Sequence, residues 1–405
     1  MKRVALVGEP DANGFAKARF WHFHDAIAAA GHEVIVVDAG GRGAEGRGGD
    51  ASGAHTTADV VVSAGAYRPT DAAIRVCGER PVWIDLPGDP YADAQAVVAR
   101  GGDGARVAED CARVFLPALA RADAFSTIGM ASRFSLIGQL GLLGRWAGPD
   151  RLPIAPIPIA WPQPPHIKTD DVNIHTYEKR RRRFSYVGTG AEGPVRVLLA
   201  GSFNTWFDDD AVGDVLIEAM RRTPVEVDVT GGPGQPGGYE RFRERFSAYA
   251  NVRFHGWLAD PQPVLSQCEV LLTLDRSDVW EPLTGSRTRV LAARAAGLRV
   301  VASSGPELID ELAREGQVRA VQSREEAVVS LLDRTPAPDP APIARRYDAK
   351  RLAEPLLAWI ANPTRAPSAA ASAPLEHANR ARERAEAELA AIRGTWAFRL
   401  GGRRR

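Results

Sequence analysis

The sequence contains few of the residues that build disulfide scaffolds or metal sites. Its 405 residues include only three cysteines, Cys77, Cys111 and Cys268, and these lie far apart without the spacing of metal ligands. An odd number of cysteines cannot form a complete set of disulfides. A reducing compartment therefore fits the chain best, and we expect neither a metal ion nor another cofactor.

Long apolar runs and an excess of charge are also absent. No stretch approaches the roughly 20 apolar residues needed to span a bilayer, and the chain starts directly with an expected strand at Val4, without a signal sequence. The 51 Lys and Arg residues nearly balance the 50 Asp and Glu residues, so charge gives no reason to expect nucleic acid as a partner. We therefore expect a cytoplasmic protein, with peripheral contact at the inner face of a membrane left open.

Short apolar runs that end at glycine or polar residues alternate with helical stretches, which indicates an α/β protein with parallel sheets. The alternation stops in a proline-rich and basic stretch and restarts near Val195. Because 405 residues exceed one ordinary core, we predict two Rossmann-like domains and a C-terminal helical tail. The expected divisions are 1–160 (first domain), 161–193 (linker), 194–343 (second domain), 344–362 (closing helix) and 363–405 (disordered linker and amphipathic basic helix).

The strands expected in the first domain share an apolar, β-branched character and cover 3–8, 34–38, 59–63, 81–85 and 124–127. Those of the second domain cover 195–200, 225–230, 252–255, 270–274 and 299–303. The principal helices are expected at 15–30, 135–146, 211–222, 239–249, 286–296 and 344–360. A further long helix is expected to end near residue 121.

The tail combines a low-complexity stretch with a helical pattern. Residues 363–374 are rich in Ala, Ser and Pro, which is typical of disorder. Apolar residues at helical spacing follow from Leu375 to Trp396, and the chain ends in three arginines. Self-association and contact with an anionic bilayer through residues 375–405 are both open.

Ligands of doubly wound sheets bind beyond the carboxyl ends of the strands, where glycine turns let the backbone approach a phosphate. Such turns follow three expected strands of the second domain. Their candidate donor-binding residues are Gly201, Ser202, Asn204, Gly231 and Trp257. Trp257 could stack on a nucleobase or fill the edge of the domain. The acidic residues 208–210 are expected to cap the following helix rather than bind a metal.

The strongest local signal is the run Gly285-Ser286-Arg287-Thr288-Arg289 at the start of an expected helix. A glycine-serine pair at that position forms a backbone anion site, and two arginines supply the charge that a diphosphate requires. Arginine at a helix N-terminus is unfavourable to the helix dipole, which a bound anion would offset. Exposed arginines on a surface helix are the alternative interpretation.

Several segments, in the same order, resemble GT-B glycosyltransferases of group 1 (family 4-like), and most of these segments fall in the donor half. The resemblance covers about residues 1–38 and 195–330. The segments are Gly31–Val34, Val252–Leu258, Trp280–Leu283, Ala295–Val301 and Glu307–Ile309. It implies two Rossmann-like domains that face a cleft, with a nucleotide diphosphate sugar bound mainly by the second.

The sequence departs from this family at its best-known pair of residues. Counting forward from Glu281, the second glutamate of the Glu-x7-Glu pattern falls on Arg289, and the alternative register gives Thr284 and Ala292. The usual Arg and Lys near Gly201 are also missing. We therefore predict a divergent subgroup in which Arg276, Arg287 and Arg289 hold the diphosphate without a metal.

In the first domain the resemblance implies that the loop over 9–14 approaches the transferred sugar. Asn13 is therefore a candidate catalytic residue, and Gly14 is a candidate donor-binding residue. Asp85 or Asp89 could act as a general base for an acceptor hydroxyl, since both follow the strand at 81–85. A simple turn over 86–89 is the alternative.

We thus expect a metal-independent glycosyltransferase that acts on a glycan, lipid-linked or small-molecule acceptor. Cell-envelope polysaccharides and glycosylated natural products are both open. Two alternatives remain, a non-catalytic GT-B subunit that activates a partner and a nucleotide-sugar epimerase.

Overall fold

The computed structural model describes most of the chain. It covers residues 1–12, 14–40, 57–146, 148–149, 151–162, 193–234, 238–258, 260–285 and 287–366, with isolated residues 384, 387–388 and 391. Asn13, Ser286 and nearly all of the tail over 375–405 therefore lie outside the described residues.

The first domain is a six-stranded parallel sheet in the order β2-β1-β3-β4-β5-β6. Its strands are β1 (Arg3–Gly8), β2 (Glu33–Asp38), β3 (Val60–Ser63), β4 (Val82–Leu86), β5 (Ala124–Thr127) and β6 (Ile154–Pro156). Its helices are α1 (Phe15–Ala29), α3 (Arg68–Cys77), α4 (Pro90–Ala99), α5 (Gly104–Arg121) and α6 (Met130–Leu142).

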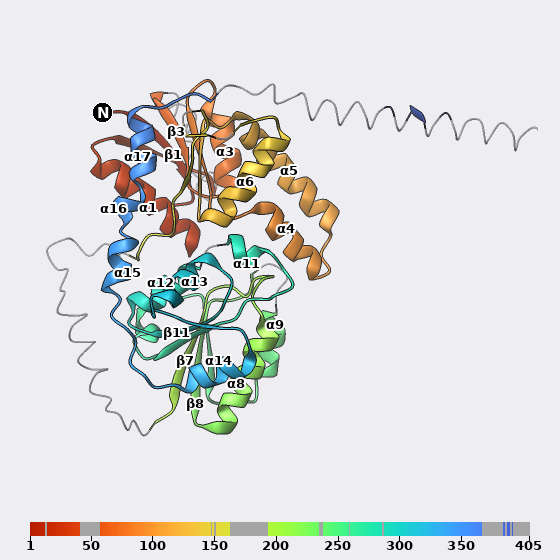
Figure 1. The fold of residues 1–405 in the computed structure, drawn as a ribbon, viewed down its shortest axis with the longest axis vertical. Coiled ribbons are helices and arrows are strands. Elements are labelled where there is room, and N and C mark those ends of the chain that lie inside the picture. Colours follow the sequence, from red (N-terminus) through yellow and green to blue (C-terminus); the bar gives the residue numbers. More distant parts are fainter. Residues whose placement is uncertain are drawn as a thin grey trace, which may run out of the picture.

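The second domain repeats this architecture with the order β12-β11-β10-β7-β8-β9 (Figure 1). Its strands are β7 (Val195–Ala200), β8 (Val225–Thr230), β9 (Val252–Gly256), β10 (Val270–Thr273), β11 (Arg299–Ser303) and β12 (Arg319–Val321). Its helices are α8 (Asp209–Arg222), α9 (Tyr239–Arg245), α10 (Gln262–Leu265), α11 (Glu281–Thr284), α12 (Thr288–Ala295), α13 (Glu307–Arg314) and α14 (Arg324–Leu332). The prediction of two Rossmann-like domains is confirmed.

The strand order of the second sheet identifies where a ligand would bind. The chain runs from β7 to β8 and β9 on one side, and β10 then pairs with the other side of β7. Such a reversal leaves a crevice between the loops that follow the two central strands. The loops after β7 and β10, which begin at Gly201 and Leu274, therefore flank the natural binding crevice.

The prediction of one helix over 344–360 is wrong in detail, because three short helices occupy this segment. They are α15 (Ala341–Arg346), α16 (Ala349–Leu352) and α17 (Glu354–Ala361). The side chain of Asp348 caps α16 by accepting a hydrogen bond from the Arg351 backbone N–H at 3.0 Å, and Pro355 starts α17. A cap and a proline inside the helical pattern explain the breaks.

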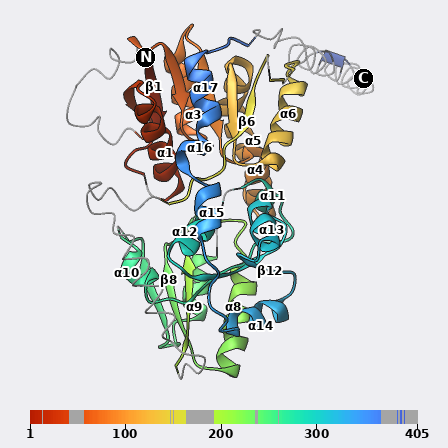
Figure 2. The ribbon, with the colours of Figure 1, turned by 60° about the vertical axis from the view of Figure 1, so that its left-hand side comes forward.

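Helix α15 still packs on the second domain, whereas α16 and α17 return to the first (Figure 2). Leu356, Trp359 and Ile360 of α17 are buried in the cluster that contains Phe20 and Trp83. The rings of Trp83 and Trp359 lie 5.5 Å apart. The end of the described chain thus completes the core of the first domain.

Arg100 and Glu307 are among the residues that join the domains at the edges that carry the strand ends. Arg100, which follows α4, donates to the backbone oxygen of Phe207 at 3.0 Å and binds the Asp209 carboxylate at 3.0 Å. Glu307 accepts a hydrogen bond from the Met130 backbone N–H at 2.7 Å, at the start of α6. None of the described helices is long and apolar enough to cross a membrane.

Candidate active site

The loops after β7 and β10 are held together across the crevice. Phe207 and Asp275 form an antiparallel bridge. The Arg276 backbone N–H donates to the Trp206 oxygen at 2.8 Å, and the Asp208 N–H donates to the Leu274 oxygen at 2.9 Å. The acidic residues 208–210 start α8 as predicted, since Asp208 caps the helix through the Ala211 N–H. These hydrogen bonds place the Trp206 ring over the crevice between the two strands.

Arg287 is the centre of a buried cluster of charges in this crevice. Its side chain is 1% exposed, and its Nε atom lies 3.0 Å from Oδ2 of Asp275. Its guanidinium lies 4.2 Å from the centre of the Trp206 ring and 3.9 Å from Oε2 of Glu281. A buried arginine is tolerated only with such partners, because desolvation of an unpaired charge costs several kcal/mol, about 3–5 when a partner is removed.

Arg289, in the first turn of α12, contacts the same ring and the loop after β7. Its guanidinium lies 4.7 Å from the centre of Trp206 and donates to the Ser202 backbone oxygen at 3.2 Å. A Cβ atom at Gly201 would stand 2.9 Å from the guanidinium, and Gly201 has a φ of +96°. Only glycine therefore fits this turn while Arg289 packs against it.

Burial shifts the pKa values of this cluster in opposite directions. Burial, with the charges of Asp93 and Asp275, raises the pKa of Glu281 to about 7, although Arg287 opposes the change. Burial and the neighbouring charge of Arg287 lower the pKa of Arg289 to about 10. Atoms Oε2 of Glu281 and Oδ1 of Asp275 are buried and accept no hydrogen bond from the described residues. Arg287 and Arg289, both in contact with the Trp206 ring, create a positive potential that would stabilise a bound anion.

The other predicted residues of the loops after β7, β8 and β9 gather beside Gly201. The Gly231 backbone N–H donates to the Gly256 oxygen at 2.7 Å. A Cβ atom at Gly231 would lie 2.1 Å from the Gly201 oxygen, and one at Gly234 would lie 2.3 Å from Oδ1 of Asn204. Trp257 is 52% exposed, so its indole is accessible to a ligand.

Gly285, Thr288 and Arg276, which are also predicted to bind the donor, lie in three different surroundings. Gly285 packs closely on the Glu281 carboxylate, and Thr288 is the first residue of α12. Arg276 instead pairs with Asp278 at 2.8 Å, and Asp278 is exposed at the surface. The structure therefore brings Arg287 and Arg289 together and leaves Arg276 apart from them.

A cavity of about 210 Å³ lies between the domains at this site. The second domain contributes Gly285, Arg287 and Glu307, and the first contributes Gly129 and Pro158. Phe15, directly after Gly14, packs with the apolar cluster of the second domain. Gly285, Arg287 and the Gly14 loop therefore all lie at the boundary between the domains.

The two carboxylates predicted as general bases have structural roles. Asp85 is 0% exposed, and it binds Arg19 at 2.6 Å and accepts a hydrogen bond from Oγ of Ser126 at 2.6 Å. An acceptor hydroxyl cannot reach a carboxylate in this position, so the Asp85 prediction is not supported by the geometry. Asp89 caps α4 by accepting from the Tyr91 N–H at 2.9 Å, in line with the turn alternative.

Sequence reasoning did not select Trp206 or Asp275 as site residues. Asp275 follows β10 by two residues, and Trp206 lies in the loop after β7. Treating every polar or aromatic residue of the loops at the switch point as a candidate would have included both. Within the described residues, no group of three or more His, Cys, Asp and Glu side chains is placed to hold a metal.

Comparisons with known proteins bear on the second domain and on the fold. Residues 194–334 match the family described as Glycosyl transferases group 1, whereas no curated protein matches the chain at a significant level. The fold is similar to that of sucrose-phosphate synthase from Thermosynechococcus elongatus, at 13% identity over 96% of this chain and 100% of that chain, with a TM-score of 0.55.

Two further solved structures share the fold. One is WaaG, a glycosyltransferase of lipopolysaccharide biosynthesis, at 15% identity over 93% of this chain and 98% of that chain, with a TM-score of 0.51. The other is Anabaena HepE in complex with UDP and glucose, at 15% identity over 89% of this chain and 100% of that chain, with a TM-score of 0.50. The chain therefore has the GT-B fold, and residues 194–334 match the family of group 1 glycosyl transferases.

Proposed function

We propose that the protein transfers a sugar from a nucleotide diphosphate sugar to a hydroxyl group of an acceptor, without a metal ion. The observation that carries this proposal is the pair of arginines, Arg287 and Arg289, stacked on Trp206 beside the Gly201 turn at the domain boundary. The solved structure of HepE with UDP and glucose gives independent support for a nucleotide ligand.

In the reaction the bond between the anomeric carbon and the diphosphate breaks, and a bond to the acceptor oxygen forms. Negative charge then builds up on the leaving diphosphate. The Gly201 and Gly285 turns bring backbone groups close to it, and Arg289 and Arg287 stabilise its charge from fixed positions. Fixed charges in a site that excludes water do this without reorganisation, which removes the need for a metal. Glu281, with its pKa of about 7, would contact the transferred sugar, as the family resemblance implies.

One observation favours a second candidate, a non-catalytic subunit that activates a partner. Counted from Glu281, the position of the second glutamate of the family pattern is occupied by Arg289. Such a subunit would bind nucleotide sugars weakly and release no free nucleotide diphosphate from them. Turnover of the donor by the isolated chain, with or without an acceptor, would exclude this candidate.

Thermal denaturation with a panel of nucleoside mono- and diphosphates tests the donor site. We expect one diphosphate to raise Tm, because a ligand at 100 times its Kd adds about 2.7 kcal/mol of stability. The increase should persist in EDTA and should largely disappear in Arg289→Met, which keeps the side-chain volume but removes the charge. Arg276→Ala is the matched control and should respond like the wild type. If no nucleotide raises Tm, the proposal is wrong.

We also propose that the tail over 375–405 and the outer face of α6 contact an anionic bilayer. Phe134, Leu142 and Trp146, on or just after α6, are 64%, 77% and 75% exposed. No Asp or Glu occurs between residues 124 and 149. Ala366 binds Asp123 and Arg145 binds the Ala122 oxygen, so the tail leaves the body beside this face. An apolar face and a basic segment together provide the two signals that stable attachment requires.

Co-sedimentation with lipid vesicles tests this contact. We expect the full chain to bind vesicles that contain phosphatidylglycerol and to be released by salt, because surface charges are screened above about 0.1 M. A chain that ends at Ala366 should bind at least tenfold less. A full chain that stays in solution with every vesicle but forms dimers would favour self-association instead.

A further inference from the structure

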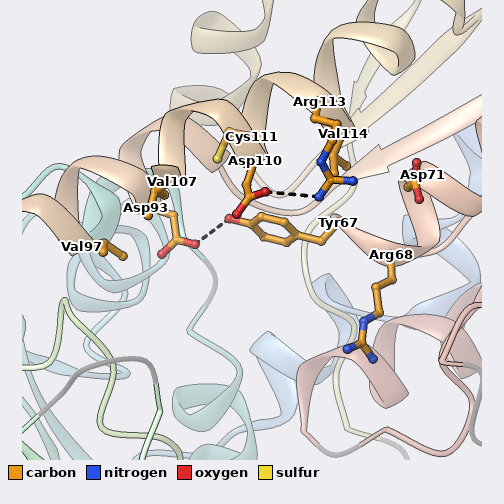
Figure 3. Close-up of a pocket in the computed structure, with 10 residues that line it drawn as sticks. All are labelled: Tyr67, Arg68, Asp71, Asp93, Val97, Val107, Asp110, Cys111, Arg113 and Val114. Carbon is orange, nitrogen blue, oxygen red and sulfur yellow. Dashed lines mark hydrogen bonds and ion pairs between the residues drawn. The ribbon is translucent and has the colours of Figure 1, made fainter. Parts of the chain in front are cut away.

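A second cavity, formed by described residues of the first domain, has no role in the site above. It measures about 460 Å³ and lies entirely in the first domain, between α3, α4 and α5. Ligand pockets in proteins cover about 300–1,000 Å³, so this cavity is large enough for a sugar ring. Figure 3 shows Tyr67 at its centre, with its hydroxyl pointing to Asp93 and with Asp110 and Arg113 of α5 above it in the view.

Tyr67 has an unusual backbone conformation for its residue type. Its φ is 57° and its ψ is −109°, and no other described residue besides glycines has a positive φ. Such a conformation costs about 1–3 kcal/mol in a residue with a side chain. Contacts on both ends of the side chain hold it, since its ring packs edge-on against Phe115 at 5.1 Å and its hydroxyl donates to Asp93 at 2.7 Å. A glycine would relieve the strain, and its absence here points to a use for the ring.

The groups around Tyr67 favour a neutral ligand with several hydroxyls. The carboxyl groups of Asp71, Asp93 and Asp110 and the guanidinium groups of Arg68 and Arg113 all line the cavity, so charges of opposite sign nearly balance there. Arg113 and Asp110 form an exposed ion pair at 3.3 Å. An anion or a cation would meet opposing charges, whereas hydroxyls can donate to carboxylates and accept from arginines. The aromatic face offers an apolar surface to the C–H groups of a sugar ring.

The cavity adjoins the donor site through α4. Arg100, at the end of this helix, binds the backbone oxygen of Phe207 in the donor loop at 3.0 Å. Helix α4 also packs against α11, which begins with Glu281. The charge of Asp93 contributes to the raised pKa of Glu281, so the two carboxyl groups lie within electrostatic reach of each other. A ligand bound beside Asp93 would therefore be next to the donor sugar.

We propose that the cavity around Tyr67 binds the acceptor, and that the acceptor presents a neutral sugar or similar polyol. Its ring packs on Tyr67 and its hydroxyls bind the carboxylate of Asp93 and its neighbours. This proposal rests on the proposed function, because it assigns the acceptor side of the same reaction.

The test uses the full-length protein and a panel of methyl glycosides of common hexoses, N-acetylhexosamines and deoxyhexoses, with binding measured by saturation-transfer NMR. At least one glycoside should bind the wild type. Tyr67→Gly removes the ring and relieves the backbone strain, so it should weaken binding at least tenfold without lowering Tm. Tyr67→Phe keeps the ring and should stay within about threefold of the wild type, because the hydrogen bond that it loses runs to Asp93 and not to the ligand. Asp93→Asn should weaken binding three- to tenfold.

Nucleotide binding to the same variants separates this proposal from the one on which it rests. Each variant should keep the rise in Tm caused by the nucleoside diphosphate, because none alters the Gly201 turn or Arg289. If the diphosphate raises Tm but no glycoside binds, or if Tyr67→Gly binds glycosides like the wild type, the acceptor assignment is overturned. If no nucleotide binds the wild type, the proposed function fails instead.

Discussion

Replacement of Arg287 by alanine is expected to lower the free energy of unfolding by about 3–5 kcal/mol. The change removes the partner of two buried carboxyl groups, Asp275 and Glu281, and empties the space over the Trp206 ring. Chemical denaturation at pH 8 measures the effect. Arg276→Ala is the control, since Arg276 forms a pair with an exposed Asp278, and such surface pairs contribute about 0–1 kcal/mol.

The cost of Arg287→Ala should fall as the pH is lowered from 8 to 5. Glu281 has a folded pKa of about 7 against an ordinary value of 4.5, and loss of Arg287 raises it further. The folded variant then holds a proton that the unfolded chain has released, so its stability decreases as the pH rises through this range. Protonation at pH 5 removes the uncompensated charge.

A neutral variant distinguishes buried charge from simple loss of volume. Arg287→Met combined with Asp275→Asn and Glu281→Gln should recover most of the stability, because well-packed neutral groups often replace a buried ion pair without loss. It should not recover nucleotide binding. An equal and pH-independent cost in Arg287→Ala and the neutral variant would contradict the importance of this charge cluster.

Replacement of Gly231 by alanine is the second change with a large expected effect. Gly231 has a φ of +109°, and a Cβ atom there would lie 2.1 Å from the Gly201 backbone oxygen. We expect a cost of about 1–2 kcal/mol from the backbone conformation and about 1–3 kcal/mol from the overlap. Because the Gly201 turn must move, affinity for the nucleoside diphosphate should fall at least tenfold, measured by titration calorimetry.

Gly256→Ala is the matched control for this prediction. Gly256 also has a positive φ, of +67°, but nothing lies within 4 Å of the position of its Cβ. It should lose about 1–2 kcal/mol of stability and keep its affinity for the nucleotide. Wild-type affinity in Gly231→Ala would show that the Gly201 turn does not hold the donor.

The fold could be predicted from the sequence wherever apolar runs were long and bounded by glycine. Strands β1 and β7 begin and end where the pattern placed them. Strands β6 and β12 were missed because each has three residues at the edge of its sheet, and β6 ends in proline. Single-residue signals such as Asp348 and Pro355 decided the breaks in the C-terminal helices, while the surrounding pattern favoured one helix.

The sequence indicated that Gly285 and Arg287 lie at the boundary between the domains, but it did not indicate that Arg287 is buried. Gly285 and Arg287 do line the cavity between the domains. Arginines are usually exposed, however, so nothing in the sequence indicated that Arg287 is 1% exposed. Its burial depends on Trp206 and Asp275, which are brought together by the bridge between Phe207 and Asp275, 68 positions apart. Contacts over such separations depend on the tertiary fold rather than on local spacing.

The return of α17 to the first domain has a consequence for the order of folding. The cluster of Phe20, Trp83 and Trp359 joins residues from both ends of the described chain. During synthesis the first domain therefore emerges with part of its core uncovered, and the second domain is made before the missing helix follows. Because α17 is made after the whole second domain, the core of the first domain cannot be completed until the second domain has been synthesised.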